Sequence, residues 1–117
     1  MSVPSASPVD LAHLSRYTGG SRELNSDVLQ LFLNQSTELM LQLQAVVEAA
    51  DTRTWRHITH SLKGAARGIG AFGLADVAAE AEPLDPAAQH GQALKVLLTL
   101  RNRAETVQDF IRAYLDE

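Results

Sequence analysis

The sequence predicts an all-α fold, an up-and-down antiparallel bundle of four main helices preceded by a short lead helix. Apolar residues recur mostly every three or four positions, which places them on one face of a helix. No segment alternates apolar and polar residues between turn residues, as a half-buried strand would. The links between the helical segments are short, which favours antiparallel neighbours.

The lead helix is expected from Asp10 to Tyr17, where the leucines fall on one side. The run Thr18-Gly19-Gly20-Ser21 predicts a helix stop at glycine, followed by a serine that caps the next helix. That second helix is expected from Leu24 to Ala49. Its apolar stripe is expected to be core and comprises Leu24, Val28, Leu31, Phe32, Leu39, Leu43, Val46 and Val47.

A third helix is predicted from Thr52 to Gly70, with Asp51 as its N-cap. The short Gly70–Gly73 segment breaks the pattern. A fourth, alanine-rich helix is then expected from Leu74 to Glu82.

The segment Glu82–Pro86 predicts a turn, with Asp85 as a cap and Pro86 at a first helical position. A fifth helix is expected to run to the C-terminus, and Gly91 leaves its start open. Its helical period is defined by Leu94, Leu97, Leu98, Arg101, Ala104, Val107, Ile111 and Tyr114, and the leucines of this stripe are expected to be core.

Composition limits the possible functions. The 117 residues suit one domain, expected as a flexible arm over residues 1–8 and a helical bundle over 9–117. A net charge of -4 and few aromatic residues argue against nucleic-acid binding. The absence of cysteine excludes disulfides and thiolate metal sites. The sequence has no spanning apolar run and no secretory signal at its start, so we expect a cytoplasmic protein that does not enter the membrane.

The third helix has two chemically distinct faces. The face expected to point into the bundle comprises Trp55, Ile58, Leu62, Ala65, Ala66 and Ile69. The opposite stripe comprises Arg53, Arg56, His57, His60, Lys63, Gly64 and Arg67. It contains no acidic residue, so an acidic chain concentrates a basic surface around one histidine. Those arginines could equally be a solubilising face.

Two glycines, Gly64 and Gly68, lie inside this helix. Each costs about 1 kcal/mol relative to alanine in a helix interior, which suggests a steric reason. Gly64 follows His60 by one turn on the same stripe. Its missing side chain clears space beside the imidazole for an approaching surface.

The run His60-Ser61-Leu62-Lys63-Gly64 resembles the signature of histidine-containing phosphotransfer (HPt) domains. The small residues and glycines that follow it, and the helix near Leu74, continue the resemblance. It implies a four-helix bundle whose exposed histidine carries a phosphoryl group between the aspartates of receiver domains. These would belong to a hybrid histidine kinase and a response regulator.

By this resemblance His60 is the phosphorylated nucleophile, reacting through its outward nitrogen. Imidazole titrates at about pH 6.5, so much of it is unprotonated at neutral pH. Lys63 can meet the phosphoryl oxygens as a point charge, and Arg67 is a weaker candidate. The family often has glutamine where this chain has Glu82. A hydrogen bond between the imidazole and the Glu82 carboxylate, and an ion pair between Glu82 and Lys63, are both open.

The remaining expectations concern partners and cofactors. Mg²⁺ would belong to the receiver, because this chain has no acidic cluster near His60. A metal shared by His57 and His60 lacks a third ligand. The chain is expected to be a monomeric phosphocarrier that does not phosphorylate itself from ATP. The expected partner-binding residues are Arg53, Arg56, His57 and Gly68, with an apolar rim at Trp55 and Leu41.

Two alternatives stay open. The same basic face could serve a helical adaptor that docks a receiver or another protein domain without chemistry. The chain could also be the phosphotransfer module of a larger kinase. The glycine pattern Gly68–Gly73 resembles a dinucleotide-binding fingerprint, but a helix precedes it where that fingerprint needs a strand.

Overall fold

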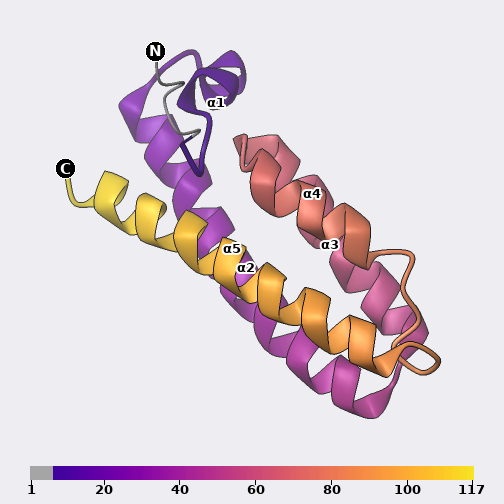
Figure 1. Cartoon of the computed structure of the whole chain (residues 1–117). Coiled ribbons are helices and arrows are strands. Elements are labelled where there is room, and N and C mark those ends of the chain that lie inside the picture. The colour runs from indigo at the N-terminus through magenta and orange to yellow at the C-terminus, as the bar shows by residue number, and fades with distance from the viewer. Residues whose placement is uncertain (1–6) are drawn as a thin grey trace, which may run out of the picture.

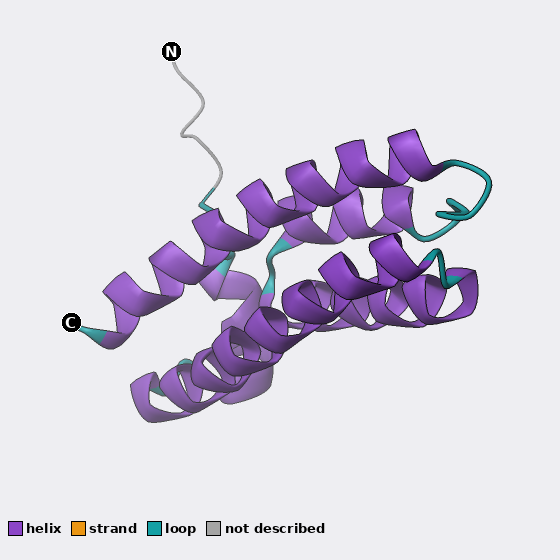
Figure 2. Ribbon diagram, turned by 90° about the horizontal axis from the view of Figure 1, so that it is seen from below, coloured by secondary structure: helices purple, strands orange, loops and turns teal. Residues whose placement is uncertain are grey.

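The structure, a computed structural model, describes residues 7–117. Within this range the chain forms five helices, and the described segments that link them are loops (Figures 1 and 2). Their bounds are α1 Leu11–Thr18, α2 Arg22–Ala49, α3 Thr52–Ile69, α4 Phe72–Ala81 and α5 His90–Leu115. The predicted all-α fold with a short N-terminal helix is confirmed. Of the expected arm, residues 1–6 lie outside the described part.

The helices α2, α3, α4 and α5 form a closed ring. Each of α2, α3 and α4 packs against the next helix along the chain, and α5 closes the ring against α2. The short α1 packs on α2 and α3 at one end of the bundle (Figure 1). This arrangement is the up-and-down antiparallel bundle that the short links predict.

The first two helix junctions follow the predicted capping chemistry. Gly19 takes a left-handed conformation with φ 67° and ends α1. The Ser21 side chain then accepts a hydrogen bond from the Leu24 amide at 3.2 Å and caps α2. At the next junction Asp51 accepts from the Thr54 amide at 3.1 Å and caps α3. These two caps are confirmed.

The turn between α3 and α4 fixes the lead segment to the bundle. Gly70 has φ 82°, and its carbonyl accepts a hydrogen bond from the Asp10 amide at 3.0 Å. A Cβ atom on Gly70 would lie 2.7 Å from the Asp10 carbonyl oxygen. Only glycine satisfies both the left-handed backbone and this close approach.

The core fills the space enclosed by the ring. From α3 it receives Trp55, Ile58, Leu62, Ala66 and Ile69, which are all buried. With one face of α3 buried in this way, the opposite face must meet solvent. The prediction that every leucine of the α2 and α5 stripes is core was wrong, because Leu24, Leu31, Leu94 and Leu98 are exposed. These four lie at the margins of the stripes, where a helix face turns away from its neighbours.

The segment after α4 differs from the prediction. Asp85 accepts hydrogen bonds from the amides of Ala87 and Ala88, but it caps a single turn rather than a helix. The helix α5 begins only at His90, with Gln89 before it and no side-chain cap. The expected helix start at Pro86 was therefore wrong. The hydrogen bonds of Asp85 close one turn at Pro86, and the chain does not continue from that turn into a helix.

No helix within residues 7–117 combines the length and the apolar character needed to span a membrane.

Candidate functional site

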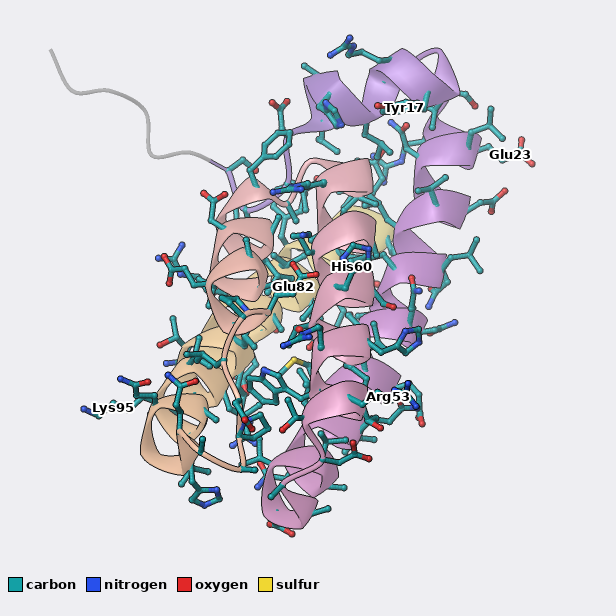
Figure 3. All side chains as sticks on the ribbon, turned by 90° about the vertical axis from the view of Figure 1, so that its right-hand side faces the viewer. Tyr17, Glu23, Arg53, His60, Glu82 and Lys95 are labelled. Atoms are coloured by element: carbon teal, nitrogen blue, oxygen red, sulfur yellow. The ribbon has the colours of Figure 1, made fainter. Side chains whose placement is uncertain are left out.

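His60 stands on the exposed face of α3. Its side chain is 67% exposed, and Figure 3 shows it on the outside of the helix beside Glu82. The buried residues of α3 determine this orientation, because Ile58 and Leu62 hold the opposite face in the core. The imidazole is therefore open to solvent and to an approaching molecule.

One carboxylate oxygen of Glu82 binds the inner nitrogen of the imidazole. Oε1 of Glu82 lies 2.6 Å from Nδ1 of His60. Because an ionised carboxylate can only accept, Nδ1 must donate, and the neutral ring carries its proton there. Among residues 7–117 Nε2 of His60 has no hydrogen-bond partner. The neutral ring thus presents a lone pair on Nε2 toward solvent.

The other carboxylate oxygen of Glu82 binds Lys63. The Lys63 ammonium donates to Oε2 at 2.5 Å, and the lysine side chain is only 18% exposed. Hydrogen bonding from Lys63, and after it from His60, holds the pKa of Glu82 below its usual value of 4.5. Both interactions that the sequence left open are present, and Glu82 bridges the lysine and the histidine.

Open space lies beside the imidazole along α3. A Cβ atom built on Gly64 or on Gly68 would meet nothing within 4 Å. Packing inside this chain therefore does not require glycine at either position. Both residues are exposed on the same side of the helix as His60.

Basic residues surround the histidine toward the start of α3. Arg53, Arg56 and His57 are exposed and line a hollow that also includes Thr52, His60 and Glu82. Figure 3 shows Arg53 on the same helix as His60. Arg67 is exposed on the other side of His60, one turn beyond Lys63. The structure thus places the predicted basic residues on both sides of the imidazole.

The two apolar residues predicted as a contact rim lie elsewhere. Trp55 is fully buried, so its place at a partner surface was wrong. Its indole fills the core, as the apolar period of α3 had also indicated. Leu41 is exposed, but it lines a groove between α2 and α5 together with Arg101 and Gln108. That groove includes no residue of α3, so Leu41 does not flank His60.

Sequence reasoning missed an apolar groove that does adjoin the histidine face. It runs between α1, α2 and α3, and its α3 side is formed by Ala65, Gly68 and Ile69. Tyr17 and Leu31 line it and are 70% and 69% exposed. The sequence places Leu31 at the edge of the apolar stripe of α2, which could have indicated this groove. Whether Leu31 is exposed there depends on where α1 packs.

No group of three or more His, Asp or Glu side chains within residues 7–117 is arranged to hold a metal ion.

Comparisons with known proteins agree with this geometry. Residues 27–113 match the Hpt domain family. The crystal structure of histidine-containing phosphotransfer protein B (HptB) from Pseudomonas aeruginosa PAO1 has the same fold, with a TM-score of 0.85 and 23% sequence identity. The match covers 96% of this chain and 97% of that one. A search of curated protein sequences found no match. The chain therefore belongs to the Hpt domain family, with a histidine phosphotransfer role in two-component signalling.

Proposed function

We propose that this protein relays a phosphoryl group between receiver-domain aspartates through phosphorylated His60. The donor would be the receiver domain of a hybrid histidine kinase and the acceptor that of a response regulator. The observation that carries the proposal is the state of the His60 ring. Its Nδ1 is tied to Glu82 at 2.6 Å while the side chain stays 67% exposed.

The hydrogen bond selects the reacting atom. With the proton on Nδ1, the Nε2 lone pair attacks the phosphorus of an aspartyl phosphate. The N–P bond forms, the P–O bond breaks, and the electron pair of that bond leaves with the aspartate carboxylate. No proton moves in this step. The phosphorylated ring becomes cationic, and the Glu82 carboxylate on Nδ1 stabilises that charge.

Lys63 supplies positive charge one turn from the nucleophile. Its ammonium is already held at Glu82, so it is oriented before a phosphoryl group arrives. With three donors it can keep one hydrogen bond to the carboxylate and offer another to a phosphoryl oxygen. The Mg²⁺ expected for the transfer would be held by the receiver domain and would neutralise phosphoryl charge there.

The open face fits a visiting domain. Gly64 and Gly68 leave space beside His60, and exposed Arg53 and Arg56 surround it with positive charge. A receiver domain needs an acidic pocket to hold its metal, so its charge would complement this surface. Arg67 and His57 would belong to the same contact.

The test replaces the nucleophile. Native protein mixed with a phosphorylated receiver should gain an acid-labile phosphoryl group, and His60→Gln should gain none. His57→Gln is the matched control: it removes another exposed imidazole from the same hollow, and it should still gain the phosphoryl group even if it binds the receiver more weakly. If His60→Gln still binds receivers and still supports signalling, the protein is a docking adaptor and the relay proposal fails.

Further parts of the proposal are tested separately. Incubation with labelled ATP and Mg²⁺ should leave the protein unlabelled if it is a carrier without autokinase activity. Profiling against a panel of phosphorylated receivers would identify the cognate kinase and regulator. Light scattering and cell fractionation test the expected monomer and its cytoplasmic location.

A further inference from the structure

We propose that Trp55 is a positioning residue for the phosphotransfer site and holds Glu82 in place against His60. This inference rests on the proposed function, because it concerns how the nucleophile is oriented. Trp55 is fully buried, and its indole Nε1 donates a hydrogen bond to the Ala81 carbonyl at 2.8 Å. The Ala81 carbonyl carbon is bonded directly to the backbone nitrogen of Glu82. The indole therefore anchors the peptide group from which the carboxylate extends.

The end of α4 needs such an anchor. Glu82 is the C-cap residue, and Pro83 follows it and cannot continue the helix hydrogen bonds. Among residues 7–117, the Ala81 carbonyl accepts one backbone hydrogen bond there, from the Leu84 amide at 3.1 Å. The tryptophan supplies a second donor from another helix. It fixes the end of α4 relative to α3, where His60 and Lys63 lie.

The carboxylate has little positional tolerance. Its two oxygens bind atoms on two side chains of α3, at 2.6 Å from His60 and 2.5 Å from Lys63. A displacement of about 1 Å would take either contact beyond hydrogen-bond distance. A second tie, from the Thr52 hydroxyl to Asp85 at 2.5 Å, holds the following turn to α3. Glu82, which binds the imidazole, lies in the sequence between the two residues that these hydrogen bonds hold.

Four charged or titratable groups lie close enough to the His60 ring to influence its protonation, and the test must separate their effects. From the end of α4 there is Glu82, and from α3 there are Lys63, Arg56 and His57. Of these only Glu82 is reached through the peptide that Trp55 holds. Loss of the indole N–H should therefore alter His60 through Glu82.

The experiment uses the full chain carrying Trp55→Phe, which keeps an aromatic ring and removes the donor. Nitrogen NMR of His60 should show a smaller fraction of the Nδ1–H tautomer across pH 6–9. Phosphoryl transfer from a receiver should slow about tenfold. The matched control is Ile58→Val, a buried residue of the same helix face. It should leave the tautomer and the transfer rate within about twofold of native protein.

A double substitution distinguishes positioning from general destabilisation. If Trp55 acts through Glu82, adding Trp55→Phe to Glu82→Ala should cost no further transfer rate. Multiplicative losses, or an unchanged tautomer in Trp55→Phe, would overturn the proposal. The tautomer is measured without any receiver, so the positioning role can hold or fail whether or not His60 proves to be phosphorylated.

A reciprocal measurement covers the case in which Trp55→Phe does not fold. Trp55 is the only tryptophan, so its indole N–H gives a single NMR resonance. Glu82→Ala, a change at the half-buried end of α4, should shift that resonance and speed its hydrogen exchange. If Glu82→Ala leaves both the chemical shift and the hydrogen exchange of the indole N–H unchanged, the proposed coupling is contradicted.

Discussion

Oε1 of Glu82 lies 2.6 Å from Nδ1 of His60, although 22 residues separate them in the sequence. The contact joins the end of α4 to the middle of α3, and Figure 3 shows the two side chains next to each other. It fixes which nitrogen of the neutral ring holds the proton, and so which one presents a lone pair.

Removing the charge of Glu82 should slow phosphorylation of His60. Glu82→Gln keeps an oxygen for Nδ1–H but no longer stabilises a cationic ring. A hydrogen bond to a charged group is worth ~1 kcal/mol more than a neutral one, so transfer from a receiver should fall about fivefold. Rapid-quench kinetics with a phosphorylated receiver measures this. Glu80→Gln, an exposed carboxylate on the same helix, should have no effect. An equal loss in both variants would refute a specific role.

The same substitution should change how stability depends on pH. The folded-state pKa of Glu82 is held below its usual value of 4.5, chiefly by Lys63. Its contribution to stability is therefore present above pH 4.5 and is lost as pH falls through the lower folded-state value. Native protein should lose more unfolding free energy on acidification than Glu82→Gln does. Urea unfolding at a series of pH values tests this. Parallel pH profiles for the two proteins would show that the ion pair contributes nothing.

Filling the space beside the histidine should separate stability from function. Gly64→Ala meets no atom of this chain within 4 Å and should stabilise the helix by up to about 1 kcal/mol. Gly64→Leu should leave the fold intact but impair transfer at least tenfold by obstructing a receiver. Thermal unfolding and transfer kinetics are measured together. Gly91, on α5, is the control position because it is equally open. Normal transfer by Gly64→Leu would show that the space has no role.

Neutralising the basic face should slow association. The double variant Arg53→Gln/Arg56→Gln should reduce the rate of receiver binding several-fold at low salt, with a weaker salt dependence than native protein. Stopped-flow binding at several salt concentrations measures both quantities. Lys95→Gln is the control, because Lys95 lies on another helix away from His60 (Figure 3). An identical salt dependence in the native protein and the double variant would show that the two arginines do not contribute to receiver binding and only keep the surface soluble.

Local chemistry explains which parts of the fold could be predicted. Gly19, Ser21 and Asp51 act through contacts within a few residues of themselves, so their caps were readable from sequence. The start of α5 was not, because Asp85 finds its partners within one turn and leaves the next helix to begin without a side-chain cap. Whether Asp85 caps a helix or only a single turn depends on how α4 and α5 pack.

The candidate site likewise has one part that the sequence predicts and another part that depends on how the helices pack. His60, Lys63 and Gly64 lie on one helix, so their shared face followed from helical spacing. The double hydrogen bonding of Glu82 depends on where a second helix ends, which spacing does not specify. Trp55 was expected both in the core and at a partner surface, and only the packed structure shows it buried with its N–H on Ala81.

The most direct test of the relay identifies the phosphorylated atom. Native protein is mixed with a phosphorylated receiver, and the product is examined by phosphorus and nitrogen NMR together with peptide mass spectrometry. A single phosphoryl group on Nε2 of His60, absent from His60→Gln, is the predicted result. Phosphorylation of Nδ1, phosphorylation of another residue, or no transfer from any receiver of a broad panel would contradict it.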